Sequence, residues 1–138
     1  MTVSLPELEL QLLDEHRFEE RAELFAEDGL FTMPGVVSSG RASIRAEGDD
    51  NPFVQGLEGG VHVNDRIYID GTTMIVEGAY RGVHVAVLRL PNGDIPPTGQ
   101  PISVPYALIY EIADGLIQNK RAYFDWGAFA RPADDQRS

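Results

Sequence analysis

The stretch ISVPYALIYEIADGLIQNKRAYFDW, residues 102–126, decides the fold class of this chain. Two long runs rich in β-branched and aromatic residues, Ile102–Ile112 and Leu116–Trp126, flank the pair Asp114-Gly115. This pair favours a tight turn because both residues tolerate a positive φ, so the stretch is predicted to form two antiparallel strands. Pro105 cannot donate a ladder hydrogen bond, and it therefore predicts an edge, a bulge or a bend in the first of them.

The residues before this stretch continue the strand pattern. Three further strands are predicted over Val61–Ile69, Thr73–Tyr80 and Val83–Leu90, where apolar residues predominate and in part alternate with polar ones. Asp70-Gly71 and Asn92-Gly93 are turn pairs that follow two of these runs. The second half of the chain is thus predicted to be an antiparallel meander.

The start of the chain is predicted to be helical. From Leu5 to Phe25 apolar residues recur at steps of three and four, and a slip at Asp14–Arg17 indicates two helices rather than one. The elements expected after them are a helix end at Asp28-Gly29, a strand over Leu30–Met33, a loop over Val36–Gly40 and a third helix over Arg41–Asp49.

Helices gathered before a run of strands are typical of an α+β fold. A long curved sheet whose concave face is covered by about three N-terminal helices would leave a pocket between the two layers. The chain has 138 residues, which fits a single domain over residues 1–138. Its core is expected over residues 8–130, with a frayed tail over 131–138.

Composition and charge exclude several classes of partner. Lys and Arg number 11 against 22 Asp and Glu, and the resulting charge of −11 would repel a phosphate backbone, so no nucleic-acid partner is expected. The apolar runs are far shorter than the roughly 20 residues that span a bilayer. The N-terminus has neither a basic start nor a long apolar core, so no secretory signal is predicted. These features favour a cytoplasmic protein with no membrane partner.

No motif for a metal or cofactor is present in the sequence. There is no cysteine, which excludes disulfides, thiolate metal sites and iron–sulfur clusters. His16, His62 and His84 are far apart and lack the spacing of a metal site. A phosphate-binding glycine loop and a Gly-x-Ser-x-Gly elbow are also absent. We therefore predict no cofactor.

Asp125 is the first candidate for catalysis. It stands between Phe124 and Trp126 near the end of the predicted last strand, where a carboxylate would lose hydration. Such a loss raises the pKa of a carboxyl group toward the range useful for proton transfer. The alternative is an aspartate at a strand end that points to water or caps a loop. His84, on a strand among valines, is the second candidate, able to hold a substrate carbonyl or to position Asp125. A histidine satisfied within the sheet is the alternative for it.

Strand periodicity suggests further pocket residues. Arg121, Tyr123 and Asp125 share one face of the last strand, and the opposite face carries Lys120, Ala122, Phe124 and Trp126. If Asp125 faces the pocket, Tyr123 and Arg121 line it too. The alternative role of Arg121 is a structural salt bridge.

Three aromatic residues complete the predicted substrate site. Tyr106 on the neighbouring strand offers a hydroxyl, although it could equally pack with that hydroxyl at the rim. Phe53 and Trp126 are expected to form hydrophobic walls, and a plain core role is the alternative for both.

Several motifs resemble a known superfamily. LFAEDGLF at 24–31, PG at 34–35 and GRASIR at 40–45 resemble the opening of nuclear-transport-factor-2-like domains. GVH at 82–84, PTGQ at 97–100, DGLI at 114–117 and RAYFDW at 121–126 resemble the second half of the SnoaL-like polyketide cyclase group. The resemblance covers about residues 8–130.

This resemblance implies an α+β cone with a cavity between sheet and helices, and frequently a homodimer formed through the sheet. It also implies that Asp125 occupies the place of the acid/base aspartate of the cyclases. His84 matches the histidine of their Gly-Thr-His segment, with Val83 in place of the threonine. Met33 stands where ketosteroid isomerases carry their catalytic base, which disfavours their chemistry.

Two functions are compatible with these patterns, since the superfamily includes both enzymes and binding modules. The first is a cofactor-independent isomerase or cyclase that moves a proton beside the carbonyl of a hydrophobic small molecule, such as a polyketide or terpenoid intermediate. Asp125 would move the proton and His84 would stabilise the enolate. The second is a non-catalytic scaffold or ligand-binding module, because the stretch from residues 12–19 through Asp28-Gly29 also resembles the start of the β subunits of ring-hydroxylating dioxygenases.

Overall fold

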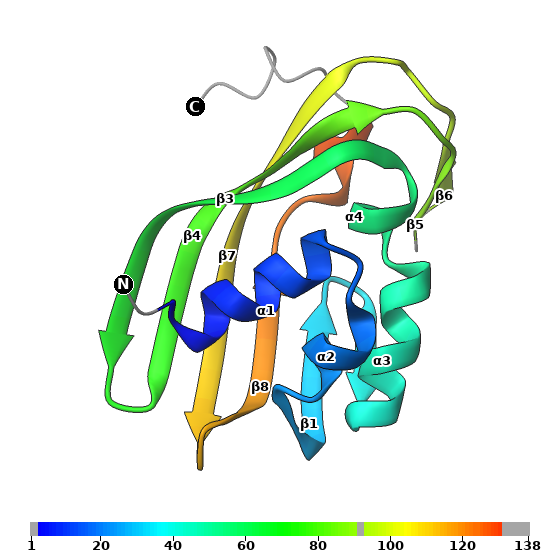
Figure 1. Cartoon of the computed structure of the whole chain (residues 1–138). Coiled ribbons are helices and arrows are strands. Elements are labelled where there is room, and N and C mark those ends of the chain that lie inside the picture. The colour runs from blue at the N-terminus through cyan, green and yellow to red at the C-terminus, as the bar shows by residue number, and fades with distance from the viewer. Residues whose placement is uncertain (1–2, 91–92, 131–138) are drawn as a thin grey trace.

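Residues 3–90 and 93–130 are described by the computed structural model, which has helices packed against one face of a curved sheet (Figure 1). The helices are α1 (Leu5–Asp14), α2 (Phe18–Ala22), α3 (Arg41–Asp50), α4 (Pro52–Gln55) and the 3-10 helix η1 (Trp126–Ala130). The strands are β1 (Phe25–Met33), β2 (Val36–Ser39), β3 (Leu57–Asp70), β4 (Thr73–His84), β5 (Leu88–Leu90), β6 (Gly93–Ile95), β7 (Pro101–Ala113) and β8 (Leu116–Tyr123). The α+β class predicted from the sequence is confirmed.

The main sheet has six strands in the order β2-β1-β8-β7-β4-β3. All neighbours are antiparallel except β1 and β8, which are parallel. The short strands β5 and β6 form a separate hairpin, as the turn pair Asn92-Gly93 predicts, although Asn92 itself lies outside the described residues. In Figure 1, α1 crosses the sheet while α2 and α3 lie beside β1, so the helices form the second layer of the fold.

The predicted pair of N-terminal helices is confirmed. Ser4 begins α1 with a capping box, in which its Oγ accepts a hydrogen bond from the Glu7 N–H and Glu7 Oε1 accepts one from the Ser4 N–H. The chain then reverses at His16, whose φ is 59°, before α2 begins. The third predicted helix is present as α3.

Asp28-Gly29 does not end a helix, contrary to the prediction. Strand β1 already begins at Phe25 and runs through both residues to Met33. Its pairing with β8 shifts register between Phe25 and Leu30, so an irregular strand absorbs these two residues. The loop expected over Val36–Gly40 is also mostly a strand, β2, which pairs with the end of β1.

Two predictions about the later strands have different outcomes. The run Val83–Leu90 is not one strand, because β4 continues to His84 and β5 begins only at Leu88. Pro105 does lie at a local edge of the sheet. The pairing of β7 with β8 stops at Ala107, so at Pro105 the paired neighbour among the described residues is Ala79 of β4.

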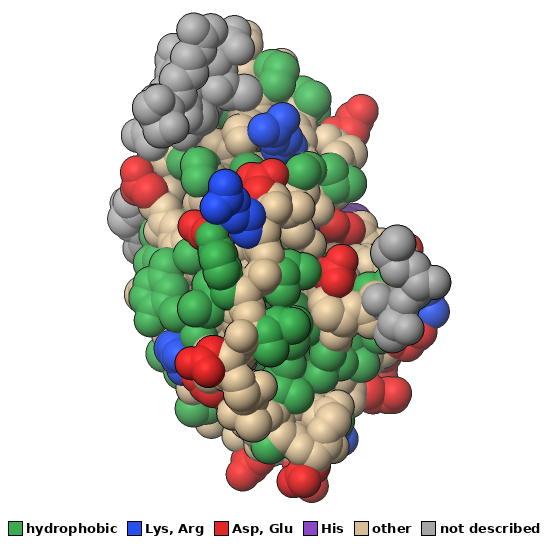
Figure 2. Space-filling model, turned by 90° about the vertical axis from the view of Figure 1, so that its left-hand side faces the viewer, with side chains coloured by type: hydrophobic (Ala, Val, Ile, Leu, Met, Phe, Trp, Pro, Cys, Tyr) green, Lys and Arg blue, Asp and Glu red, His purple; other side chains and the backbone are tan. Residues whose placement is uncertain are grey.

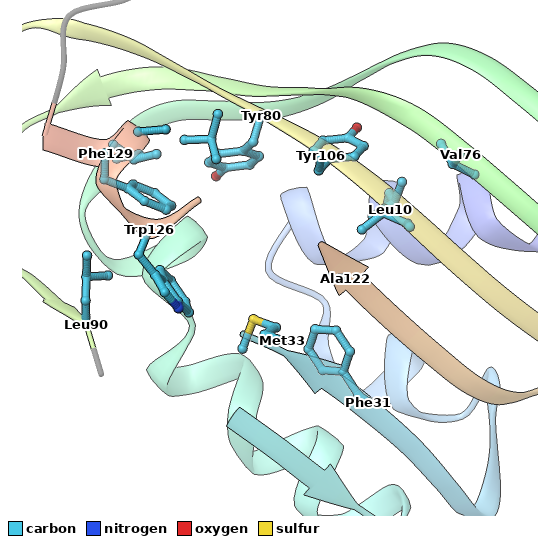
Figure 3. Packing of buried hydrophobic residues seen from close by; sticks show 14 of the residues in the cluster. Leu10, Phe31, Met33, Val76, Tyr80, Leu90, Tyr106, Ala122, Trp126 and Phe129 are labelled. Carbon is cyan, nitrogen blue, oxygen red and sulfur yellow. The ribbon is translucent and has the colours of Figure 1, made fainter. Parts of the chain in front are cut away.

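The core lies between the concave face of the sheet and the helices, and Figure 3 shows part of it. Strand residues at alternate positions point inward, and α1 and η1 cover them. The inward-facing residues shown there include Phe31, Met33, Val76, Tyr106 and Ala122, covered by Leu10 of α1 and by Trp126 and Phe129 of η1.

The outer edge of the sheet carries exposed apolar side chains. Val61, Val63, Ile67, Tyr68 and Ile69 of β3 are each between 36% and 70% exposed. Figure 2 shows apolar side chains gathered on this side of the molecule. A homodimer through the sheet stays a prediction. Among the described residues no helix is long and apolar enough to cross a membrane.

Candidate functional site

The sequence predicts that Asp125 lies in the interior, but in the structure it lies at the surface. Strand β8 ends at Tyr123, and the exposed Asp125 precedes η1. Its Oδ1 accepts a hydrogen bond from the Gly127 N–H at 2.9 Å, and its carbonyl oxygen accepts one from the Ala128 N–H at 3.0 Å. Asp125 therefore caps η1, and the prediction of desolvated surroundings for its carboxylate is wrong because the strand ends three residues earlier than predicted, at Tyr123.

The face that Asp125 was expected to share is the outer face of the sheet. Tyr123 is 53% exposed, and Arg121 Nη2 lies 3.4 Å from Glu111 Oε1 in a salt bridge on the surface. Lys120 and Ala122, on the opposite face, are buried. The alternation predicted from the sequence is correct, but the other face lines the interior, so Arg121 and Tyr123 do not contribute to the pocket.

His84 is fully buried at the end of β4. Its Nδ1 lies 3.3 Å from Thr98 Oγ1, and its Nε2 has no hydrogen-bond partner among the described residues. Within the described residues, the hydrogen bonds given for His84 and for Asp125 thus go to different partners, and they do not join the predicted pair.

The two predicted aromatic walls also differ from expectation. The buried Trp126 donates from Nε1 to the carbonyl oxygen of Pro34 at 2.8 Å and belongs to the core. The side chain of Phe53, in α4, lies outside what the structure describes.

A small cavity remains between the sheet and the helices. Its volume of about 20 Å³ is enough for one water molecule or one polar atom of a ligand. The lining is mostly apolar, with a few polar side chains, and Tyr106 from the predicted site is part of it. The lining residues are Leu13, Phe31, Met33, Asn51, His62, Tyr106, Leu108, Lys120, Ala122 and Phe124.

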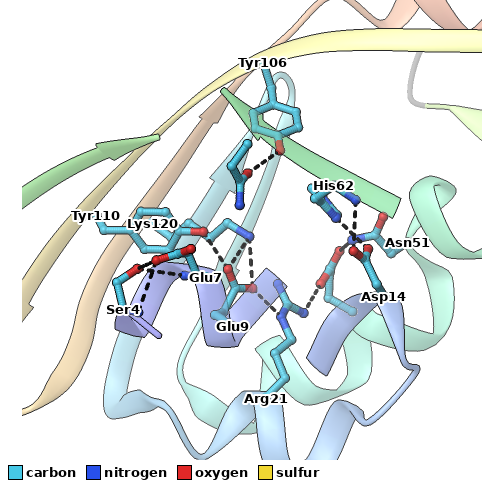
Figure 4. Close-up of polar contacts among 12 residues, drawn as sticks. Ser4, Glu7, Glu9, Asp14, Arg21, Asn51, His62, Tyr106, Tyr110 and Lys120 are labelled. Atoms are coloured by element: carbon cyan, nitrogen blue, oxygen red, sulfur yellow. Dashed lines mark hydrogen bonds and ion pairs between the residues drawn. The ribbon is translucent and has the colours of Figure 1, made fainter. Parts of the chain in front are cut away.

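The wall of this cavity holds a pair formed by His62 and Asp14. His62 Nδ1 lies 2.6 Å from Asp14 Oδ1, and the His62 backbone N–H donates to Asp14 Oδ2 at 2.9 Å (Figure 4). Asp14 is the last residue of α1, and His62 lies on β3, so the pair joins the helix to the edge of the sheet. Only 6% of the His62 side chain and 16% of the Asp14 side chain are exposed.

These contacts fix the chemical state of His62. A carboxylate can only accept a hydrogen bond, so Nδ1 carries the proton and Nε2 is the basic nitrogen of the neutral ring. Burial lowers the pKa of His62 below its ordinary value of 6.5, and Asp14 offsets this only in part. The imidazole is therefore neutral at pH 7 and able to take up a proton.

A larger groove lies on the other side of His62. It runs between α1 and β3 with a volume of about 480 Å³, which is in the range of small-molecule sites. Its lining combines apolar and acidic side chains and, within the part of the chain that the structure describes, includes no Lys or Arg: Val3, Glu7, Leu10, Gln11, Asp14, Glu15, Val61, His62 and Asn64. His62 thus lines both the groove and the inner cavity.

Two tyrosines hold the ring of His62 in place. The centroid of the His62 ring lies 4.6 Å from that of Tyr80 and 5.5 Å from that of Tyr106. Tyr106 also donates its hydroxyl to Asn64 Oδ1 at 2.7 Å. Gly78 is needed there, since a Cβ at this position would come within 2.1 Å of the Val63 carbonyl oxygen and within 2.9 Å of that hydroxyl. Burial raises the pKa of Tyr80 and Tyr106, so both hydroxyls remain protonated.

A buried ion cluster lies beneath the cavity (Figure 4). Glu9 accepts hydrogen bonds from Arg21 Nε at 2.7 Å, from Lys120 Nζ at 3.0 Å and from the Tyr110 hydroxyl at 2.6 Å. Burial alone would raise the pKa of Glu9, but Lys120 and Arg21 lower it to about 2. Glu9 is therefore ionised although no part of it is exposed.

Hydrogen bonds through Glu47 also connect Arg21 to Asn51 in the cavity wall. Arg21 Nη1 donates to Glu47 Oε2 at 3.1 Å, and Asn51 Nδ2 donates to Glu47 Oε1 at 2.6 Å. The two carboxylates of Glu9 and Glu47 balance the charges of Arg21 and Lys120.

Sequence reasoning missed His62, Asp14 and the ion cluster. The signal for His62 was present, because Val61-His62-Val63-Asn64 alternates and places His62 and Asn64 on one face of a strand. The signal for Lys120 was its position on the same face as Ala122. Nothing in the sequence paired Glu9 with Lys120, since 111 residues separate them.

Comparison with known proteins agrees with this architecture. The family model of the SnoaL-like domain matches residues 9–119, and the chain therefore belongs to the SnoaL-like family. No curated protein matches the sequence at a significant level.

Solved structures share the fold at low sequence identity. A protein with a ketosteroid isomerase-like fold from Catenulispora acidiphila, in complex with trimethylamine, superposes with a TM-score of 0.76 at 17% identity, over 100% of both chains. A candidate SnoaL-like polyketide cyclase from Jannaschia sp. gives 0.71 at 18% identity, over 96% of this chain and 99% of that one. An epoxide hydrolase of M. tuberculosis gives 0.66 at 19% identity, over 91% and 83%. At these identities the likeness establishes the fold, and the function has to be argued from the site.

Proposed function

We propose that this protein is an enzyme of the isomerase or cyclase type, in which His62, oriented by Asp14, transfers protons beside the carbonyl group of a hydrophobic small molecule. The observation that carries this proposal is the Asp14–His62 pair, with Nδ1 and Oδ1 2.6 Å apart, at the boundary between an open groove and an apolar cavity. A carboxylate that holds a neutral imidazole by its Nδ1–H is a general arrangement for a base.

The chemistry follows from this arrangement. His62 Nε2 takes a proton from the carbon next to the carbonyl, the C–H electron pair forms a carbon–carbon double bond, and the carbonyl oxygen becomes an enolate oxygen. The imidazolium is stabilised by Asp14 until it returns the proton. Return of the proton to another carbon gives an isomer, and attack of the enolate on a second carbonyl closes a ring.

The charge of the groove supports a neutral substrate. Glu7, Asp14 and Glu15 line it, no Lys or Arg among the described residues does, and the whole chain has a charge of −11. A phosphorylated substrate would be repelled. The apolar residues Val3, Leu10 and Val61 suit a hydrophobic body.

The experiment measures exchange of α-protons for deuterium, a readout of proton transfer that does not require the natural substrate. A panel of cyclic and aryl ketones is incubated with the protein in D2O, and the α-proton signals are followed by NMR. We expect exchange with the wild type, and a loss of exchange in His62→Gln and, to a smaller extent, in Asp14→Asn.

The matched control is Asp125→Asn. It makes the same change as Asp14→Asn, but at the aspartate that the sequence analysis predicts to be the acid/base group. Exchange at the wild-type rate in this variant supports the proposal. Exchange that is lost in Asp125→Asn and kept in His62→Gln would contradict it and would support the acid/base role predicted for Asp125. Absence of exchange from every ketone in the wild type favours the scaffold or binding module.

A further inference from the structure

Arg21 has one side-chain nitrogen that the fold does not use. The residue is fully buried, and its Nε and Nη1 donate to Glu9 and Glu47. Its Nη2 has no hydrogen-bond partner among the described residues. A buried donor without a partner is costly, and in native proteins it usually has a water or a ligand as its partner.

The guanidinium group of Arg21 is fixed in position. It lies over the rings of Phe25 and Phe31, with its Cζ 5.6 and 5.2 Å from the two centroids. Carboxylates hold it on two sides, so Nη2 cannot turn toward another partner without breaking an ion pair. The donor is therefore preorganised.

Lys120 brings a second donor to the same place. Arg21 Nε and Lys120 Nζ both donate to Glu9 Oε2, at 2.7 and 3.0 Å. Lys120 lines the inner cavity and lies over Phe31, with Nζ 4.7 Å from the ring centroid. Asn51, which also lines the cavity, is linked to Arg21 through Glu47. In Figure 4 the head of Arg21 lies between Glu9 and Asn51, on the side of Glu9 where Lys120 ends.

Charge and size define the ligand that would fit there. Two carboxylates already balance the two cations, so an oxygen bound there is held by the hydrogen bonds of the two donors and not by a net positive charge. Its donors nevertheless suit an acceptor oxygen that is neutral on binding and gains negative charge during a reaction. The cavity of about 20 Å³ has room for one such oxygen.

We propose that Arg21 Nη2 and Lys120 Nζ form a two-donor subsite for the carbonyl oxygen of the substrate and stabilise that oxygen as it becomes an enolate. This inference rests on the proposed function, because it supplies the electrophilic half of the proton transfer that His62 performs as a base. The electron pair released when His62 takes the α-proton ends on the oxygen held by Arg21 and Lys120.

The test uses 4-nitrophenol, whose coloured phenolate form is an enolate analogue. The dye is titrated with the full chain at a pH at which half of it is ionised in water. Binding to the wild type should raise the phenolate absorbance. Arg21→Lys keeps a cation beside Glu9 but lacks Nη2, and it should bind phenolate roughly tenfold more weakly, the effect of one charged hydrogen bond.

The matched control is Arg45→Lys in α3, an arginine whose salt bridges lie on the surface. This variant should bind phenolate as the wild type does. Equal binding by Arg21→Lys and the wild type would overturn the subsite, and so would a wild type that does not raise the phenolate absorbance.

Two further measurements keep the test decisive. If Arg21→Lys is not folded by circular dichroism, the ¹⁵N-labelled wild type replaces it, and the arginine side-chain signals must shift when the dye is added; unchanged signals overturn the subsite. His62→Gln should lose α-proton exchange, which tests the proposed base separately from the subsite. Phenolate binding without any ketone exchange in the wild type would support the subsite and contradict the proposed function alone, and exchange without phenolate binding would overturn only the subsite.

Discussion

The two regions that cover the concave face of the sheet, one around α1 and the other around η1, differ in their chemistry. At the α1 end, buried charges and a histidine gather around Glu9 and Asp14. At the η1 end, aromatic rings pack against one another. Trp126 is stacked on Phe129, with ring centroids 5.9 Å apart (Figure 3). Phe124 lies edge-on to Trp126, with centroids 4.7 Å apart. The polar side chain of that end, Asp125, is turned outward to cap η1.

This difference separates residues that shape the cavity from residues able to do chemistry in it. The packed aromatic rings at the η1 end exclude water and are rigid, but none of them carries a group that can act as an acid or a base near pH 7. The α1 end places a carboxylate on an imidazole and two cations on one carboxylate, in surroundings where electrostatic interactions are strong. Aromatic residues beside an aspartate in the sequence therefore do not locate the acid/base group.

The strongest prediction compares the two buried histidines. His62→Gln should lower the rate of α-proton exchange by about 10²–10⁴-fold, the usual contribution of a general base. His84→Gln should leave that rate unchanged, because His84 is bonded to Thr98 and not to a carboxylate. Both variants are measured at pH 7 on the same ketone. A loss in His84→Gln as large as in His62→Gln would mean that the division between the two ends is wrong.

The next prediction concerns stability at the α1 end. Glu9→Gln leaves Arg21 and Lys120 buried without their shared counter-charge, and it should lower the free energy of unfolding by about 3–5 kcal/mol. At the η1 end, Trp126→Phe removes the hydrogen bond to the Pro34 carbonyl and should cost about 1 kcal/mol. Urea denaturation of both variants checks the difference, and equal losses would contradict it.

The pH dependence of stability should also come from the α1 end. The pKa of Glu9 is about 2 in the folded protein, against an ordinary value of 4.5 for the unfolded chain. The ionised Glu9 therefore stabilises the fold fully above pH 4.5, and this stabilisation is lost as the pH falls toward 2. Lys120, Arg21 and Tyr110 are the titratable and charged groups that contact it. Denaturation between pH 2 and 6 should show a steep loss of stability in the wild type and a flatter curve in Glu9→Gln.

The sequence predicted most of the fold because the signals were local. Steps of three and four, the slip at Asp14–Arg17 and the turn pair Asp114-Gly115 each act over a few residues, and the elements they indicate are present. Strand β1 was missed in part because its pairing with β8 joins residues almost 90 positions apart, which outweighs the local preference of Asp28-Gly29.

The site was much less predictable. Tyr106 was identified as a pocket residue, and it does line the cavity. The prediction for Asp125 is wrong because it depends on the residue at which β8 ends. Strand ends are hard to predict, and here the strand gives way to the cap of η1 before Asp125 is reached. The pairing of Asp14 with His62 joins the end of a helix to an edge strand, and no spacing in the sequence encodes it.

The smallest effect is expected at Asp125. Asp125→Ala removes the acceptor that caps η1 and should lower the free energy of unfolding by about 1 kcal/mol, whereas Asp125→Asn keeps an acceptor oxygen and should lose less. Neither variant should alter α-proton exchange, because the side chain is exposed and bonded to the Gly127 N–H. Thermal denaturation and the ketone assay measure the two quantities on the same samples. A fall in exchange with no change in stability would place the acid/base group at the η1 end after all, since a cap alone acts on stability and not on proton transfer.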